Sequence, residues 1–386
     1  HKEYNEIHKT CDDLINKAGS TLFQKHSNSF VLSNALSYHY EDVIEIPKEY
    51  SGYSILSENG EIIHTQDING RLYCKVSLPP LSFTTFSKGE KLKQSANNAS
   101  GYVLENELIK YTFSNDGTLI SALDKETNNG LLDGPGNVLS LYEDRPLNWD
   151  AWDIDFYYKE SLLETAKTNK IKQVISGPVL SSLEFHYTVG NSILKQKITL
   201  GNQSKRLDFD TYVEWKEKHK MLRVHFPTNI RSEQASFDIQ YGYVKRNTHK
   251  NTSWDRAKFE VVGHKYADLS NNDNGIAILN DCKYGYSVLD NVIDLNLLRS
   301  PNNPDADADL GEHSFIYSFY PHQNDLIRSD VIQESTILNH PPLLFNGVKN
   351  NNSKSLINFD GKGIEITAIK KSEQSNEIIF RAVETL

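Results

Sequence analysis

The stretch LDFDTYVEW, residues 207–215, decides the fold class because its side chains change character at every step. Its odd-numbered positions carry a mainly apolar set and its even-numbered positions a mostly polar set. Successive side chains of a β-strand point to opposite faces, so this period of two places the apolar set on one face. The stretch therefore predicts a β-strand with one face in the core.

Turn signals recur between runs of this kind. Asn-Gly and Asp-Gly pairs stand at residues 59–60, 69–70, 116–117, 129–130, 133–134, 274–275, 346–347 and 360–361. Such pairs supply the positive φ angles that tight hairpins need. Many short strands without alternating helices predict a mainly β fold built from antiparallel β-sandwich domains. They argue against a doubly wound nucleotide-binding fold, and neither GxGxxG nor a Walker A motif occurs.

One segment, at the N-terminus, has helical periodicity instead. Apolar residues recur at spacings of three and four from Tyr4 to Ala18, which predicts a short amphipathic helix over residues 3–18 that ends at Gly19. It is the one helix that the sequence leads us to expect. The polar stretch SKGEKLKQSANNASG, residues 87–101, lacks periodicity and predicts a linker.

Composition and charge exclude several kinds of partner. The chain has 386 residues, 38% of them hydrophobic, so it can order itself as two or three domains. Its 41 basic and 51 acidic residues give a net charge of −10, and no run of five basic residues occurs. We therefore expect neither nucleic acid nor an anionic membrane as a partner. No apolar stretch approaches the roughly 18 residues of a membrane span.

The cysteines and the first residue bear on the origin of the chain. Cys11, Cys74 and Cys282 form an odd and widely spaced set, which favours buried thiols in a reducing compartment over a disulfide framework. We therefore expect a cytoplasmic protein. Because His1 is the first residue and Met221 is the one methionine, we expect a processed product or an excised piece.

Most catalytic signatures are missing from the sequence. The 13 histidines include no HExxH, no zinc-type pair and no His-x-Asp, the cysteines form no CxxC, and no GxSxG occurs. We therefore expect no cofactor and no zinc site within this chain. His225 and His322 are each predicted to be structural residues with satisfied hydrogen bonds. Glu143 and Asp144 would point to opposite faces of a strand, so they form a weak carboxylate pair.

The first cluster that could carry chemistry is NWDAWDID, residues 148–155. Its candidate binding residues are Trp149, Asp150, Trp152 and Asp153. Indole faces stack on the apolar face of a pyranose, while carboxylates accept hydrogen bonds from its hydroxyls. An extended run would set Trp152 and Asp153 on opposite faces. The structural alternative is a corner in which the tryptophans are core and the aspartates bind backbone amides.

The second cluster is RSPNNPDADADLGEH, residues 299–313, with Arg299, Asp305 and Asp309 as candidates. Its alternating aspartates resemble the first ligands of a calcium loop, but the glycine and the closing glutamate of such a loop are absent, which excludes an EF-hand. The prolines and the acidic run predict a long ordered loop between strands, and such loops are often functional. The alternative is a solvated charge cluster with Arg299 as its internal counter-ion.

Long stretches of the chain resemble one enzyme family. They are LENELIKYTFSNDGTLISALDKET (104–127), LNWDAWDID (147–155), FDTYVEWKEKHKMLRVHFP (209–227), YGYVKRNTHKNTSWDRAKFEVVGHKYADLS (241–270), NGIAILNDCKYGYSV (274–288) and LLRSPNNPDADADLGEHSFIYSFYPH (297–322). Together they resemble the C-terminal region of glycoside hydrolase family 38 α-mannosidases, in the cytosolic and bacterial branch. The resemblance covers nearly the whole chain.

The resemblance implies an architecture. The family has an N-terminal catalytic α/β domain, a helical bundle, and β-sandwich domains that include a galactose-mutarotase-like supersandwich. On this basis we expect residues 1–20 to be the end of the bundle and residues 21–90 a small β-sandwich. Residues 95–340 would form the supersandwich and residues 341–386 a C-terminal β segment.

The resemblance also implies retaining hydrolysis of α-mannosides through a covalent mannosyl-aspartate, with a second aspartate as acid/base and a zinc ion. Those groups belong to the N-terminal domain, so none is assigned here, and zinc is expected only in that missing domain. We expect this chain to support its own catalytic domain and to be inactive alone. The loops around Trp149 and Arg299 would form the rim of the active site for an α-mannoside or oligosaccharide. A homo-oligomer is compatible with this reading.

Two other functions stay open. The supersandwich resembles mutarotases, so a free-standing aldose epimerase could recruit His225, His313 and Glu312 as acid and base. The other is a carbohydrate-binding module. Interconversion of sugar anomers would identify the first, and glycan binding without turnover the second.

Overall fold

The computed structural model describes residues 2–68, 70–91, 97–99, 101–349, 357 and 363–386. The chain divides into two compact units. One comprises His1–Ala96 with His340–Thr385, and the other comprises Asn97–Asn339 together with Leu386. The finer division into four parts stays a prediction.

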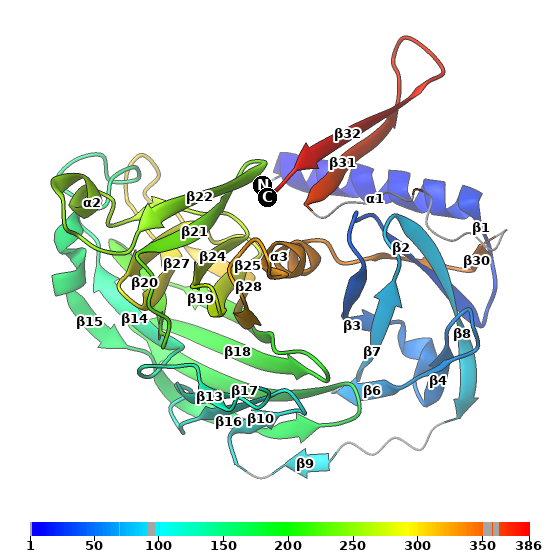
Figure 1. Cartoon of the computed structure of the whole chain (residues 1–386), viewed down its shortest axis with the longest axis horizontal. Helices are drawn as coiled ribbons and strands as arrows, with labels where there is room; N and C mark the ends of the chain where they lie inside the picture. The colour runs from blue at the N-terminus through cyan, green and yellow to red at the C-terminus, as the bar shows by residue number, and fades with distance from the viewer. Residues whose placement is uncertain (1, 69, 92–96, 100, 350–356, 358–362) are drawn as a thin grey trace. The chain divides into compact units, whose positions relative to one another are not determined.

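A ten-stranded antiparallel sheet dominates the larger unit (Figure 1). Its strands, in spatial order, are β22 (Gly242–Asn247), β21 (Gln234–Ile239), β24 (Tyr266–Ser270), β25 (Asn274–Asn280), β28 (Gly311–Gln323), β19 (Leu207–Trp215), β18 (Ser192–Gly201), β17 (Leu180–Val189), β16 (Lys167–Ser176) and β9 (Asn97–Ala99). The strand predicted over residues 207–215 is β19, and all of its odd-numbered residues are buried. This strand prediction is confirmed.

Two further sheets complete the larger unit. The six-stranded sheet has the order β15 (Leu162–Thr165), β14 (Val138–Glu143), β20 (Lys220–Pro227), β27 (Val292–Arg299), β26 (Gly285–Leu289) and β23 (Val261–Val262). The four-stranded sheet has the order β10 (Val103–Glu105), β11 (Ile109–Phe113), β12 (Leu119–Asp124) and β13 (Asn129–Gly130). One apolar core joins all three sheets.

Aromatic rings connect the two large sheets of the sandwich. Phe209 of β19 stacks on Tyr317 of β28 with ring centroids 4.9 Å apart. Phe226 of β20 meets Phe209 at 5.9 Å and so joins the sheets through the core. Burial of such rings supplies much of the stabilisation of a sandwich core. The predicted mainly β, antiparallel sandwich fold is confirmed.

The six-stranded sheet has one apolar and one polar face. Leu222, Val224 and Phe226 of β20 belong to the apolar core. The alternating Arg223 and His225 therefore lie on the opposite face, which we call the outer face. This face also carries Asp294 and Asn296 of β27, the cross-strand partners of His225 and Arg223.

Two helices of the larger unit were not predicted. Helix α2 (Ser253–Ala257) is capped by Thr252, whose Oγ1 accepts a hydrogen bond from Asp255 N at 3.1 Å. Helix α3 (Val331–Asn339) buries small polar residues as well as apolar ones, so it has no clean apolar stripe. The prediction of a single helix is wrong because neither helix has the length and periodicity that marks one in sequence.

The smaller unit contains four small sheets and the N-terminal helix. The five-stranded sheet has the order β29 (Leu343–Asn346), β2 (Ser29–Asn34), β8 (Ser82–Lys91), β4 (Tyr53–Leu56) and β5 (Ile62–Ile63). The others are β3 (Tyr40–Ile46), β7 (Arg71–Leu78) and β6 (Thr65–Ile68); β1 (Phe23–Gln24) with β30 (Val348–Lys349); and β31 (Ile364–Lys371) with β32 (Ile378–Glu384). Short 3₁₀ turns are η1 (Lys48–Tyr50) here and η2 (Phe156–Glu160) in the larger unit.

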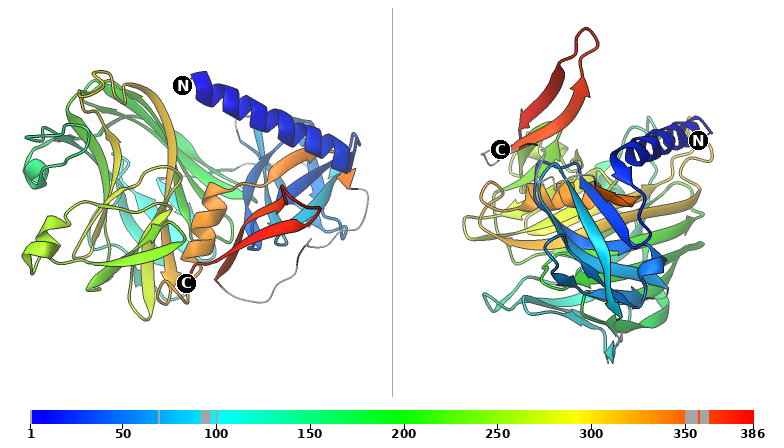
Figure 2. Two further views of the ribbon diagram at one scale, coloured as in Figure 1. Left: turned by 90° about the horizontal axis from the view of Figure 1, so that it is seen from above. Right: turned by 90° about the vertical axis from the view of Figure 1, so that its right-hand side faces the viewer.

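Helix α1 spans Lys2–Leu22 and therefore includes Gly19. Figure 2 shows it as one continuous helix. The predicted end at Gly19 is wrong. A Cβ at this position would overlap the ring of Phe345, so the glycine lets β29 pack close to the helix. The start of the predicted linker is also corrected, because residues 87–91 belong to β8 and residues 97–99 form β9.

Candidate functional site

The tryptophan cluster is a tight turn and not an extended run. Both Trp152 N and Asp153 N donate to the carbonyl of Trp149, at 2.7 and 2.8 Å. Trp149 itself has a left-handed backbone with φ of 57°. Because the turn follows the end of β14, no neighbouring strand holds it extended.

The indoles of this turn face solvent. Trp149 is 69% exposed and Trp152 is 70% exposed. The alternative in which both tryptophans belong to the core is therefore wrong. The adjoining Phe156 and Tyr157 of η2 are also exposed. Large exposed aromatic side chains at neighbouring positions are typical of a surface that binds a ligand or another polypeptide.

Asp150 joins the two clusters that the sequence singled out. Its Oδ2 accepts hydrogen bonds from the backbone amides of Asn302 and Asn303, at 2.7 and 3.0 Å. This half of the structural alternative is confirmed, because the aspartate binds backbone amides. Asp153, by contrast, keeps an exposed side chain.

Arg299 fixes the same turn from the other side. Its Nε donates to Oδ2 of Asp144 at 2.5 Å, and its Nη1 donates to the carbonyl of Ala151 at 3.3 Å. Its Nη2 donates to the carbonyls of Asp150, at 2.9 Å, and of Asp153. The planar guanidinium thus closes the turn with all three of its nitrogens.

Asp144, the buried partner of Arg299, is a residue that sequence reasoning undervalued. Its side chain is 2% exposed, and burial raises its pKa although Arg299 opposes the rise. The only sequence signal was the neighbouring carboxylate Glu143. The partner of Asp144 lies 155 residues along the chain, so no local pattern could reveal it.

The acidic loop does not use Arg299 as its counter-ion, which corrects that expectation. Asp305, Asp307 and Asp309 are all exposed, and Lys218 Nζ binds Asp307 Oδ1 at 3.0 Å. Asp305 accepts from the backbone amide of Asp307 at 3.0 Å. Within the described part of the chain, no hydrogen bond or ion pair joins Asp305 or Asp309 to the turn. Among the described residues, no three His, Cys, Asp or Glu side chains are grouped so that they could hold a metal.

A second arginine holds the segment that follows the turn. Arg223 is 0% exposed, and its Nε donates to Asp294 Oδ1 at 2.6 Å. Its Nη1 donates to Glu260 Oε2 at 3.1 Å, and the guanidinium lies 5.2 Å from the ring centroid of Tyr158 in η2. The hydroxyl of Tyr158 donates to Glu260 at 2.5 Å. The sequence offered no signal for this cluster.

Burial shifts the pKa values of groups around Arg223. It raises the pKa of Glu260, against the opposing pull of Arg223. It lowers the pKa of Lys159, whose Nζ donates to Ser287 Oγ at 2.7 Å, and it lowers the pKa of His225. Clusters of shifted pKa values are common at functional sites, so the outer face is a second candidate region.

The two histidines predicted to be structural behave differently. His322 is satisfied, because Nε2 lies 2.8 Å from Asp268 Oδ1 and Nδ1 lies 3.2 Å from the carbonyl of Gln323. That prediction is confirmed. His225 is half-buried, and no described residue forms a hydrogen bond with its ring, so its structural role stays a prediction. Its strand places it on the outer face, with Asp294 of β27 opposite it on one side and Val138 of β14 on the other.

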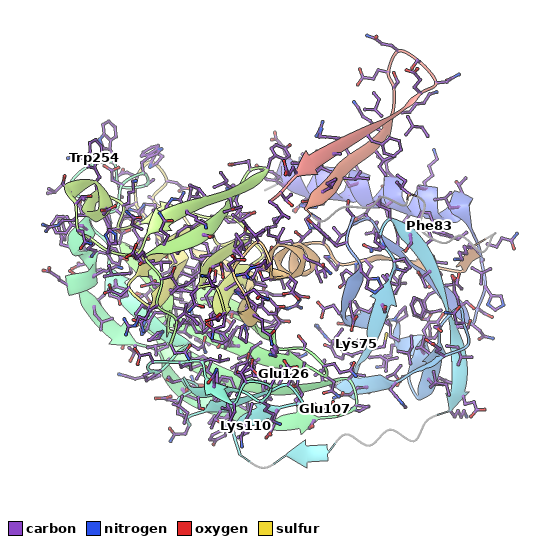
Figure 3. The ribbon with its side chains drawn as sticks, in the orientation of Figure 1. Lys75, Phe83, Glu107, Lys110, Glu126 and Trp254 are labelled. Atoms are coloured by element: carbon purple, nitrogen blue, oxygen red, sulfur yellow. The ribbon has the colours of Figure 1, made fainter. Side chains whose placement is uncertain are left out.

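Trp254 of α2 is 78% exposed and points away from the fold in Figure 3.

The three cysteines are free, but only Cys74 is buried, so the expectation of buried thiols is wrong for Cys11 and Cys282. No helix in the described ranges is both long and apolar enough to cross a bilayer.

Similarity to known proteins agrees with this geometry. Residues 104–307 match the family model described as glycosyl hydrolases family 38 C-terminal domain. Alpha-mannosidase G of Dictyostelium discoideum is 38% identical over 93% of this chain and 35% of its own length. Alpha-mannosidase of Saccharomyces cerevisiae is 35% identical over 67% of this chain and 26% of its own.

A solved structure shows the same fold. The crystal structure of an alpha-mannosidase from Enterococcus faecalis matches 100% of this chain and 54% of its own, with a TM-score of 0.76 and 17% identity. The chain spans between about a quarter and a third of the length of the curated relatives named above. Matches of this extent and identity leave one conclusion: the chain belongs to glycosyl hydrolase family 38, and residues 104–307 are its C-terminal domain.

Proposed function

We propose that this chain is the C-terminal β portion of an α-mannosidase and that its tryptophan turn lines the rim of the active site. The observation that carries the proposal is the pair of exposed indoles of Trp149 and Trp152, held on a turn that Arg299 closes. Exposed aromatic rings on a fixed backbone suit the apolar face of a pyranose. The parent reaction would be retaining hydrolysis of an α-mannoside, as the resemblance implies.

Within the rim, the residues have different roles. The indoles stack on sugar and exclude water, and the exposed carboxylate of Asp153 accepts hydrogen bonds from hydroxyls. Arg299 is a positioning residue, because Asp144 and backbone carbonyls take up all three of its nitrogens.

The catalytic groups are proposed to lie in the remainder of the parent protein. The described residues of this chain bring no three potential ligands together, so they do not fit the zinc ion that the family implies. No step of hydrolysis is therefore assigned to this chain, and we propose that it is inactive alone. Its partners would be its own catalytic domain and the mannoside. A cytoplasmic location is supported by three cysteines without a disulfide.

Substitutions in the full-length parent protein test this proposal. Trp152→Ala should lower kcat/KM for an α-mannoside by a factor of roughly 5 to 150, the usual cost of one well-placed contact, and leave the unfolding midpoint unchanged. Asp153→Asn should act in the same direction. The matched control is Trp254→Ala, an exposed tryptophan outside the turn. Unchanged kinetics in both rim variants would remove the turn from the site.

A further inference from the structure

Two facing side chains on the outer face each have a buried atom without a hydrogen-bond partner. The Nη2 atom of Arg223 and the Oδ1 atom of Asn296 are buried and form no hydrogen bond. The half-buried ring of His225 lies beside them on the same face of β20. Buried polar groups are nearly always paired, and each unpaired one costs about 1 to 3 kcal/mol. Two such atoms on facing side chains indicate a missing partner.

Strand pairing places these three groups in one row. Arg223 of β20 faces Asn296 of β27, and His225 faces Asp294. One step nearer the turn, Met221 faces Arg299. Residues two apart on a strand share a face and lie about 7 Å apart, so the row begins about 7 Å from Arg299 and ends at about 14 Å. The row therefore continues the rim along the same face.

Charges of both signs surround the row. Arg223 and Lys159 are cations, and Asp294 and Glu260 are anions close enough to interact with both. Lys250 adds a weaker positive interaction with Lys159. Burial lowers the pKa of His225, so its ring adds no charge near pH 7. The cations and anions of the row already have partners, which disfavours a charged ligand there.

We propose that this row, Arg223, His225 and Asn296, is a subsite for a neutral pyranose unit, adjoining the unit that the tryptophan turn binds. A sugar hydroxyl can accept from Arg223 Nη2 and donate to Asn296 Oδ1, and another can bind the ring of His225. The subsite rests on the proposed function, because the rim supplies the adjoining sugar.

Access to the row requires a movable cover. Lys159 reaches from η2 to Ser287 of β26, the cross-strand neighbour of Asp294. Its Nζ donates to Ser287 Oγ at 2.7 Å and also interacts with Asp294 and Glu260. Tyr158 belongs to the same cover, because its ring centroid lies 5.2 Å from the Arg223 guanidinium and its hydroxyl binds Glu260. Lys159 and Tyr158 must therefore both move before a sugar reaches Arg223.

Titration with methyl α-mannoside and with an α-linked mannobiose tests the subsite. The readout is the ¹⁵N chemical shift of the His225 ring, with His225→Gln to identify the signal and the exposed His8 as internal control. The mannobiose should shift the His225 signal, and Asn296→Leu and His225→Phe should each weaken mannobiose binding at least fivefold. His8→Phe should change nothing.

Stability measurements separate a binding role from a structural one. Asn296→Leu removes an unpaired buried acceptor, so it should leave the unfolding midpoint unchanged or raise it. A lowered midpoint together with unchanged binding would show a structural residue and overturn the proposal.

The outcomes also distinguish the subsite from the rim. If the fluorescence of the rim tryptophans responds to sugar while His225 does not, the subsite is wrong and the rim stands. If neither responds in the full-length protein, both proposals fail. Equal shifts of His225 with glycerol would show an adventitious additive only. A His225 signal already shifted in the sugar-free full-length protein, and insensitive to sugar, would assign the row to a contact with the parent's own polypeptide and overturn the subsite.

Discussion

Two arginines hold the aromatic segment of residues 149–160, and they differ in how completely their donors are used. Arg299 uses all three nitrogens on Asp144 and on backbone carbonyls. Arg223 binds Asp294 and Glu260 but leaves Nη2 without a partner. Arg299 thus has a protein partner at each of its nitrogens, which suits a residue that positions the turn. A buried guanidinium nitrogen with no acceptor indicates that a partner is missing.

The largest effect is expected when the more deeply buried arginine is removed. Arg223→Met leaves the carboxylates of Asp294 and Glu260 without their cation, and breaking a buried ion pair in this way costs about 3 to 5 kcal/mol. Chemical denaturation measures the loss. The control is Arg231→Met, which breaks an exposed pair with Asp133 and should cost less than about 1 kcal/mol.

A compensating variant sharpens this test. Adding Glu260→Gln and Asp294→Asn to Arg223→Met removes the stranded charges and should restore part of the stability. If Arg223→Met proves as mild as the Arg231 control, the buried cluster does not hold η2.

A smaller loss is expected at the other arginine. Arg299→Met strands Asp144, but burial already raises the pKa of this carboxyl, so it can take up a proton. We expect a loss of about 2 to 3 kcal/mol. Arg299→Lys should recover less than half of it, because a lysine ammonium cannot bind a carboxylate and several carbonyls in one plane.

The mobility of the turn is a second measure of the effect of Arg299→Met. In a Trp254→Phe background, this substitution should make the indole side chains of the turn more mobile, which lowers the anisotropy of their fluorescence. An Arg299→Lys variant as stable as the unsubstituted protein would show that only the charge matters and that the planar guanidinium does not position the turn.

The smallest effect concerns pH and contrasts the two histidines. Burial alone would lower the pKa of His322, but Asp268 outweighs it, with smaller help from the carbonyl of Gln323 and from Asp330, and the pKa is raised. Its contribution to stability is complete below the unfolded value of about 6.5 and is lost as pH rises through the folded pKa. For His225, whose pKa burial lowers, stability is instead lost as pH falls below about 6.5.

Unfolding free energies measured from pH 5 to 9 test the direction of the pH dependence expected for each histidine. His322→Gln should remove the decline on the alkaline side, and His225→Gln should reduce the decline on the acid side. An alkaline decline that persists unchanged in His322→Gln would refute the assignment.

Some features could be predicted from the sequence because they are local. The alternation of residues 207–215 sets which side chains of β19 are buried, and this depends only on the period of a strand. The Asp-Gly pair at residues 116–117 behaves similarly, since Gly117 has a φ of 83°. Where a close contact intervenes, local reasoning fails, as at Gly19, whose position is set by the ring of Phe345.

The sequence by itself determined the antiparallel sandwich, the aromatic segment and the family, because strand period, turn residues and long motifs depend only on residues that are neighbours in the sequence. Only the tertiary structure decided what those residues do. Arg299 meets Asp144 and Arg223 faces Asn296 because β20 pairs with β14 on one side and β27 on the other. Strand register is fixed by burial of the whole core, so partners far apart in sequence cannot be deduced from either residue alone.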